Sequence, residues 1–415
     1  MTQILGRENE IDRIVRLLDR DDLRLLTLLG PGGVGKTRLA QEVTRLVAPD
    51  FAHGVCFVSL ASIRDPGLVP KAVAQAVGIQ ESSDRDAVEL LAGLLAGRHL
   101  LLVLDNLEQV IAASGWLADL LARCSRLKVL VTSRIALDIA GEQRMVVPPL
   151  PVPSSAEEVQ DENAAVELFC QRARAVDLTF HLNNEHAGVV AEICRRLDGL
   201  PLAIELAAAR VKVLSPEAIL ARLTNRLTLL TGGRRDVPDR LRSMRDAIGW
   251  SYDLLPVPDQ RVFCRLSTFA GGFTLEAAAF VAAWPESRIA DDAVMDGIGR
   301  LIDHSLIQPT TGGLDSRFQM LETIREYGLQ EIATSGQDDL SHLAHAEYYR
   351  QLADQAQTAL IGPDQATWLN RLDAELPNIR GAMTWLEAQD RLDDAILLNA
   401  RIQWFLNIRG HSVET

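Results

Sequence analysis

The segment 30–37 has residue types and spacing that could bind phosphate. It matches the pattern G-x-x-x-x-G-K-[ST] in full, and it lies between an apolar run and a helical pattern. Glycines let backbone N–H groups turn toward phosphate oxygens, and the positive end of the following helix adds to the attraction. Lys36 can neutralise the β- and γ-phosphates, and the Thr37 hydroxyl can bind Mg²⁺. We therefore predict that ATP or ADP binds here with Mg²⁺, in contact with Gly30, Pro31, Gly32, Gly33, Val34, Gly35, Lys36, Thr37 and Arg38.

A second acidic ligand follows the apolar run 100–104. Asp105 would emerge beside the phosphates and complete the Mg²⁺ site; a strand that merely ends in a turn aspartate is the alternative. Asn106 stands where fast ATPases commonly hold a carboxylate, and an amide cannot accept a proton from water, so we expect slow hydrolysis. Glu108 could substitute, or it could be a solvated residue favoured by the dipole at a helix start.

The segment 131–134 places two hydroxyls and the Arg134 guanidinium at the end of another apolar run, where a γ-phosphate would lie. We predict that Arg134 senses that phosphate, with Lys36 and Asp105 as the other catalytic groups. A surface arginine after a strand is the alternative.

The elements that position these residues form a repeating pattern. Apolar residues recur at helical spacing over 8–19, and four apolar runs are separated by helix-length segments. This pattern predicts a parallel sheet flanked by helices, an α/β P-loop domain over 1–150. The four runs are 23–29, 55–60, 100–104 and 127–131.

Beyond this region the chain is predicted to be mainly helical. Four prolines in 147–153 mark a boundary, and helical patterns at 156–175, 185–196 and 202–213 predict an all-α domain over 151–235.

Two further domains are expected after the glycine pair at 232–233. Helices followed by extended pieces at 306–309 and 317–320, joined by Thr-Thr-Gly-Gly, predict a winged-helix domain over 236–335. The helical remainder, 336–415, is expected to begin an α-superhelical, TPR-like domain that continues past this fragment, with Trp368, Trp385 and Trp404 as packing anchors.

Composition limits the partners and the compartment. Lys plus Arg total 42 against 56 for Asp plus Glu, so the mean field repels nucleic acids and anionic membranes. Five scattered cysteines without a C-x-x-C pair suit reduced, buried thiols. No signal peptide or long apolar segment is present, so we expect a cytoplasmic protein with no membrane partner.

Several motifs together resemble the NB-ARC type of STAND signalling ATPases. They are Leu-Gly-Arg-Glu at 5–8, the loop at 30–37, Leu-Asp-Asn at 104–106, Thr-Ser-Arg at 132–134 and Gly-Leu-Pro-Leu-Ala at 199–203. Segments 250–255, 321–327 and 375–380 resemble bacterial members found in large LuxR-type and TPR-containing transcriptional regulators. The resemblance spans essentially the whole chain.

This resemblance implies further nucleotide contacts. Gly6 and Arg7 would pass beside the adenine, and Pro201 would close over the base; a first-turn proline chosen for its fixed φ is the alternative. The Met-His-Asp motif that locks the ADP state of relatives corresponds to Met-Leu-Glu at 320–322, where leucine cannot donate the hydrogen bond. Glu322 remains a candidate contact, and another group must restrain the closed form.

Other charged patches give weaker signals. The expected recognition helix, 291–304, carries four aspartates against one arginine, so direct DNA binding is not expected. His342 and His345 share a helix face but lack further ligands for a metal. A basic stretch could grip nucleic acid or an acidic partner, although a solvated interdomain surface is favoured; it comprises Arg222, Arg226, Arg234, Arg235, Arg240, Arg242 and Arg245.

The leading hypothesis is an ATP/ADP-dependent switch in transcriptional or defence signalling. ADP would hold the domains closed, and ATP, with a signal molecule or protein sensed by the C-terminal helices, would open them for self-association into a homo-oligomer. The alternatives are a DNA-binding regulator that acts through its own winged helix, and a metabolic ATPase.

Overall fold

The computed structural model describes residues 4–78, 84–153, 163–233, 241–284, 291–310, 316–336 and 338–410. The chain forms two compact units. The first comprises Met1–Ser251 with Asp303–Ser305, and the second comprises Tyr252–Ile302 with Leu306–Thr415.

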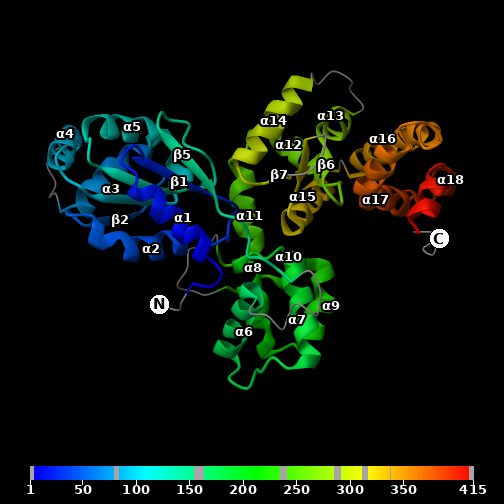
Figure 1. The fold of residues 1–415 in the computed structure, drawn as a ribbon, viewed down its shortest axis with the longest axis horizontal. Coiled ribbons are helices and arrows are strands. Elements are labelled where there is room, and N and C mark those ends of the chain that lie inside the picture. Colours follow the sequence, from blue (N-terminus) through cyan, green and yellow to red (C-terminus); the bar gives the residue numbers. More distant parts are fainter. Residues whose placement is uncertain are drawn as a thin grey trace. The chain divides into compact units, whose positions relative to one another are not determined.

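The first unit is built on a five-stranded parallel sheet in the order β2-β3-β4-β1-β5 (Figure 1). Every residue of β3 and β4 is buried, as expected where helices cover both faces of a parallel sheet. The predicted α/β fold class is confirmed. The strands are β1 (Leu25–Leu29), β2 (Val55–Ser59), β3 (Leu101–Asp105), β4 (Lys128–Thr132) and β5 (Glu142–Val146).

The fifth strand was not predicted. β5 pairs with β1 at the edge of the sheet, and Met145 is its only fully buried residue. Because most side chains of this edge strand are exposed or only half-buried, the strand needs no run of apolar residues. Its sequence therefore lacks the hydrophobic pattern by which the other four strands were predicted.

Helices surround the sheet, and the predicted helix over 8–19 is confirmed to the residue. The α-helices are α1 (Glu8–Asp19), α2 (Lys36–Val47), α3 (Val69–Ala76), α4 (Asp84–Leu95) and α5 (Ser114–Arg123). Short 3-10 helices are η1 (Ala48–Asp50), η2 (Pro66–Leu68) and η3 (Leu107–Ala113).

The rest of the first unit is helical, as predicted. The side chain of Asn163 accepts hydrogen bonds from the Ala165 and Val166 amides and so starts α6, while the predicted earlier start falls in 154–162, outside the described residues. The elements are α6 (Ala164–Val176), α7 (Asn184–Arg196), α8 (Pro201–Ala208), η5 (Ala209–Lys212), α9 (Pro216–Arg222), η6 (Leu223–Asn225), α10 (Arg226–Leu229) and α11 (Met244–Asp253).

The second unit begins with helices and a three-stranded antiparallel sheet in the order β6-β8-β7. The predicted hairpin is formed by β7 and β8, and most of its predicted turn lies outside the described residues. The elements are α12 (Val257–Leu266), β6 (Phe273–Thr274), α13 (Leu275–Ala283), α14 (Asp291–Asp303), β7 (Gln308–Thr310), β8 (Arg317–Gln319) and α15 (Glu322–Ser335).

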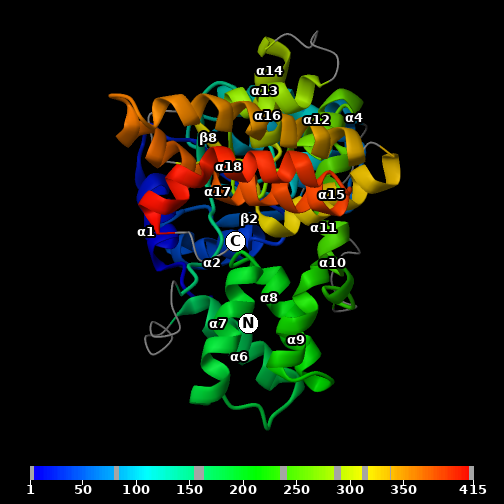
Figure 2. The same ribbon diagram turned by 90° about the vertical axis from the view of Figure 1, so that its right-hand side faces the viewer.

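Three long helices complete this unit and lie side by side (Figure 2): α16 (Asp338–Ala359), α17 (Gln365–Ala388) and α18 (Leu392–Arg409). Trp385 stacks on His342, as a packing residue should. The prediction that Trp404 is a packing anchor is wrong, because 55% of this residue is exposed.

A buried polar cluster joins α17 to the winged-helix sheet. Glu375 pairs with Arg317 of β8 and accepts a hydrogen bond from Asn378 at 3.0 Å. The Asn378 amide group also accepts from the Ala270 backbone N–H at 2.7 Å and donates to the Gly272 carbonyl at 2.8 Å. Two residues of the 375–380 motif therefore fix a helix to the loop beside β6.

Candidate nucleotide-binding site

The loop 30–35 has a backbone that only glycine adopts easily. φ is +153° at Gly30, +83° at Gly33 and +99° at Gly35, which precedes the first residue of α2. The motif glycines therefore allow the chain to curve between β1 and α2, as the phosphate-binding pattern predicts.

Lys36 lies against this loop. Its buried ammonium donates hydrogen bonds to the carbonyl oxygens of Gly30 at 2.6 Å and Pro31 at 3.1 Å. The positive charge is thus held within the curve of the loop, where an anionic ligand would be attracted.

Thr37 and Asp105 meet, as predicted from their spacing. One carboxylate oxygen, Oδ1 of Asp105, accepts hydrogen bonds from the hydroxyls of Thr37 at 2.7 Å and Thr132 at 2.6 Å. Thr132 is the partner of Asp105 in the register of β3 and β4. Burial raises the pKa of Asp105, against the opposing effect of these two hydrogen bonds. A buried carboxylate next to a hydroxyl is a donor set that suits Mg²⁺, and a cation would offset the cost of its charge.

Asn106 and Glu108 follow Asp105. Asn106 has φ +65°, a left-handed conformation that asparagine tolerates better than most residues, and its backbone N–H donates to Thr132 Oγ1 at 3.0 Å. The chain turns there into η3, and Glu108 is only 1% exposed. The alternative interpretation of Glu108 as a solvated residue is therefore wrong.

Arg134 is also buried, with 3% exposed, so the surface-arginine alternative is wrong. Nε of Arg134 lies 3.3 Å from Oε1 of Glu108, and Nη1 donates hydrogen bonds to the Ala247 carbonyl at 2.5 Å and the Ser251 hydroxyl at 2.7 Å. Both acceptors belong to α11. A Cβ placed on Gly32 would lie 2.9 Å from this same Nη1 and 2.8 Å from the Ala247 oxygen, so the guanidinium and α11 both adjoin the phosphate-binding loop.

Ala247 and Ser251 were not predicted as site residues. Ser251 lies in the 250–255 motif, which carried only a family resemblance, and nothing in its sequence spacing links it to Arg134. The signal available was a small hydroxyl residue inside that motif.

Gly6 and Arg7 lie against the loop and the start of α6. The buried Arg7 guanidinium donates to the Val34 carbonyl at 3.2 Å and pairs with Glu10 at 3.1 Å. Burial lowers the pKa of Arg7, with Glu10 opposing this effect. Gly6 has φ +59°, and a side chain there would collide with Ala164. The predicted adenine contact is untested.

The helical region reaches the loop through the 199–203 motif. α8 begins at Pro201, as predicted, and the Leu202 backbone N–H donates to the Gly33 carbonyl at 3.1 Å. Arg38 of α2 is half-buried. Burial is the main cause that lowers its pKa, and the positive charge of Arg172 lowers it further. The structure therefore brings this motif against the glycine loop.

Contacts of the remaining predicted residues are as follows. Glu322, in the second unit, pairs with Arg325 at 2.7 Å, and its nucleotide contact stays a prediction. Of the basic stretch, Arg222 donates to the Ala218 carbonyl of its own helix, and Arg226 donates to the Arg196 carbonyl at the end of α7. Arg234, Arg235 and Arg240 are outside the described residues.

The cysteines are buried thiols, as predicted. All five cysteines are free and buried. No group of three or more His, Cys, Asp or Glu with metal-binding geometry is found among the residues that the structure describes. In the same residues, no helix is both long and apolar enough to cross a membrane.

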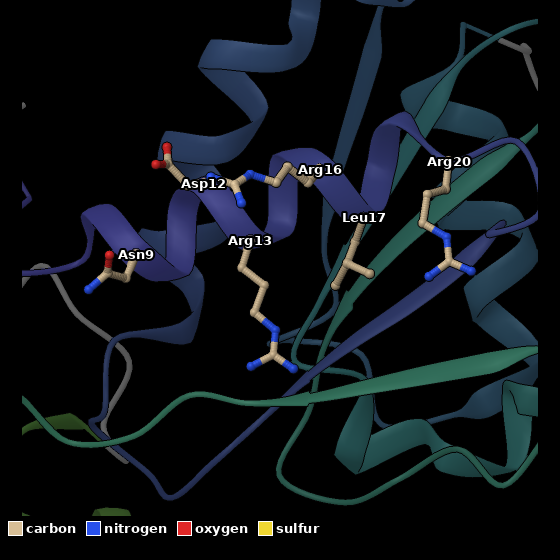
Figure 3. Close-up of a pocket in the computed structure, with 6 residues that line it drawn as sticks. All are labelled: Asn9, Asp12, Arg13, Arg16, Leu17 and Arg20. Carbon is tan, nitrogen blue, oxygen red and sulfur yellow. The ribbon is translucent and has the colours of Figure 1, made fainter.

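A surface hollow of about 340 Å³ lies along α1 (Figure 3). Arg13, Leu17 and Arg20 extend from one side of the helix, and Arg20 pairs with Asp22 at 2.6 Å. Its lining residues belong to α1 or directly follow it, and none belongs to the predicted nucleotide site, so the hollow has no part in the chemistry above.

Two protein-family models match parts of this chain. The NB-ARC domain family matches residues 7–176, and a winged helix-turn-helix domain family matches residues 257–333. The glycine loop, the parallel sheet and these matches define a P-loop NTPase domain followed by a winged helix.

Two mycobacterial proteins are similar to this chain over most of its length. A Mycobacterium tuberculosis protein, Rv0894, is 35% identical over 352 residues, which cover 85% of this chain and 86% of that protein. Another, named as an HTH-type transcriptional regulator, Rv0890c, is 38% identical over 385 residues, or 92% of this chain and 42% of the relative. This chain belongs to the same family as these mycobacterial proteins, and its residues 7–176 form an NB-ARC domain.

The chain spans 42% of the length of that regulator. Among solved structures, a STAND protein with a tetratricopeptide repeat sensor, PH0952 from Pyrococcus horikoshii, is 16% identical with a TM-score of 0.34, covering 96% of this chain and 58% of that one.

Proposed function

We propose that this chain is a nucleotide-dependent signalling switch that binds ATP or ADP with Mg²⁺ and hydrolyses ATP slowly. The observation that carries the proposal is the pair of hydrogen bonds that Asp105 Oδ1 accepts from Thr37 and Thr132 beside the glycine loop. In this proposal Thr37 and Asp105 hold Mg²⁺, and Lys36 contacts the β- and γ-phosphates. The metal, when bound, supplies positive charge to the phosphates.

Arg134 supports a closed resting form in this proposal. Its guanidinium donates to Ala247 and Ser251 of α11 while it adjoins Gly32. A γ-phosphate at the loop would compete with α11 for the same donor, because phosphate is a stronger acceptor than a carbonyl or a hydroxyl. Arg134 would then release α11 in the ATP state, and this contact would replace the histidine lock that Leu321 cannot provide.

The wider roles are proposed from family membership. A signal molecule or protein would bind α16–α18, Pro201 would report closure over the base, and the ATP state would assemble into a homo-oligomer in the cytoplasm. The four-domain division at 150, 235 and 335 remains part of this proposal. Regulation of transcription agrees with the name of the mycobacterial relative.

Direct DNA binding is not proposed. α14 is rich in aspartate, and its Arg300 makes a bidentate pair with the buried Asp259 at 2.5 and 2.8 Å. Arg317 of the hairpin is paired with Glu375. These two arginines are therefore already paired with carboxylates, and a gel shift at low salt that retarded duplex DNA would contradict this view.

The test is nucleotide binding by Lys36→Ala, with Lys212→Ala as a matched exposed control. We expect the Kd for ADP and for ATP to rise at least about 100-fold in the first variant, because two charge-assisted contacts are lost, and to stay unchanged in the control. Denaturing the purified wild type should release ADP. If Lys36→Ala binds both nucleotides as wild type does, the proposal is wrong.

A further inference from the structure

Glu108 is a buried carboxylate that none of the predicted ligand contacts uses. Its side chain has 0% exposure, and within the described part of the chain neither of its oxygens accepts a hydrogen bond. Burying a charged group without hydrogen bonds is costly, and such exceptions in native proteins require an explanation.

Its neighbours place Glu108 at the phosphate side of the loop. Nε of Arg134 is 3.3 Å from Glu108 Oε1, and the other end of that guanidinium adjoins Gly32. Burial is the main cause that raises the pKa of Asp105, and the charge of Glu108 raises it further, so the two carboxylates are close enough to interact. The chain makes a left-handed turn at Asn106, and Glu108, three residues after Asp105, is buried beside Arg134 rather than exposed to solvent.

We propose that Glu108 is the catalytic base for ATP hydrolysis, in the role that the Asn106 amide cannot fill; this inference rests on the proposed function. Glu108 accepts a proton from a water molecule as the water oxygen bonds to the terminal phosphorus. The bond from that phosphorus to the bridging oxygen breaks, ADP leaves with the electron pair, and the protonated Glu108 returns its proton to solvent.

The ability of Glu108 to accept a proton depends on the position of Arg134. While Arg134 lies beside Glu108 and donates to Ala247 and Ser251, the carboxylate charge is engaged by the guanidinium. Movement of Arg134 to a γ-phosphate would free Glu108 for proton transfer. Hydrolysis would thus follow the opening of the α11 contact, and slow turnover is the expected result.

The experiment compares Glu108→Gln with Glu89→Gln, which breaks an exposed pair with Arg123. For Glu108→Gln we expect ATP and ADP affinities close to wild type and a single-turnover hydrolysis rate at least about 100-fold lower, the lower end of a general base's contribution. The Glu89 variant should match wild type in both. In Glu108→Ala, added formate should restore part of the rate, which a merely structural role would not allow.

Each outcome decides a different claim. A wild type that binds no nucleotide refutes the proposed function itself. A wild type that binds ATP but never hydrolyses it overturns the base and also the hydrolysis step of the proposed function, but not nucleotide binding. A Glu108→Gln variant that hydrolyses ATP at nearly the wild-type rate overturns only the base. A Glu108→Gln variant that loses ATP affinity as Arg134→Ala does would show that Glu108 serves only to hold Arg134, and also overturns it.

Discussion

The acid stability of the second unit should depend on one buried histidine. His345 of α16 packs against the rings of Phe269 and Tyr349, with centroids 5.0 and 4.8 Å away. Burial lowers its pKa from 6.5 to about 3; the charges of His342 and Arg325 act in the same direction, and a hydrogen bond with Asn378 opposes them. The folded protein therefore keeps this ring neutral over the whole physiological range.

The sign and size follow from proton linkage. The unfolded chain binds a proton at His345 below its ordinary pKa of 6.5, and the folded chain does not until the pH reaches about 3. The stabilising effect is therefore complete above pH 6.5 and is lost progressively as the pH falls. At roughly 1.4 kcal/mol per pH unit below the unfolded pKa, the free energy of unfolding should fall by about 2 kcal/mol between pH 7 and pH 5.

The assay is urea unfolding followed by tryptophan fluorescence at pH 7, 6 and 5. His345→Gln cannot titrate, so its free energy of unfolding should fall by about 2 kcal/mol less over this range than that of wild type, whatever its stability at pH 7. His181→Gln, at an exposed position, should keep the full wild-type pH dependence. Parallel curves for wild type and His345→Gln would refute the reasoning.

Two further predictions concern the nucleotide site. Mg²⁺ should increase the affinity of wild type for ATP, and in Asp105→Asn this increase should be more than about 100-fold smaller, because the variant lacks the charged metal ligand. The measurement is a titration of ATP binding with and without chelator. Since burial raises the pKa of Asp105, the folded state disfavours its charge, so this variant should unfold at no lower urea concentration than wild type at pH 7 without metal. Ser251→Ala removes one hydrogen bond to Arg134 and should lower the ratio of ADP affinity to ATP affinity by about tenfold. An unchanged ratio would show that the contact between α11 and Arg134 does not influence which nucleotide binds.

Local chemistry made the phosphate-binding loop predictable. Lys36 and Thr37 follow glycines whose positive φ values are required by the same curve that exposes backbone N–H groups. Asp105 could be placed beside them because the carboxyl ends of all strands in a parallel sheet lie at one edge, and β3 is an apolar run that ends at this acid. These features depend on neighbouring residues and on strand direction, which a sequence records.

The surroundings of Arg134 could not be predicted in the same way. Its acceptors, Ala247 and Ser251, lie 113 and 117 residues further along the chain, and a backbone carbonyl carries no sequence signal. The burial of Glu108 depends on the conformation of Asn106, and asparagine is compatible with both left-handed and ordinary turns. The exposed alternatives for Glu108 and Arg134 could not be ruled out from the sequence, because packing between elements, rather than residue type, decides which charges are buried.

The 375–380 motif illustrates the same limit in the second unit. Its resemblance to relatives was visible in the sequence, but its role was not, since Glu375 and Asn378 form bonds to Tyr349 of α16 and to the loop at Ala270 and Gly272. A helix interior position is an unusual place for a buried asparagine unless its amide satisfies backbone groups elsewhere. When a polar residue is predicted on the buried face of an amphipathic helix, the prediction of a helix need not be weakened. The residue instead indicates that its side chain bonds to a backbone group far away in the sequence.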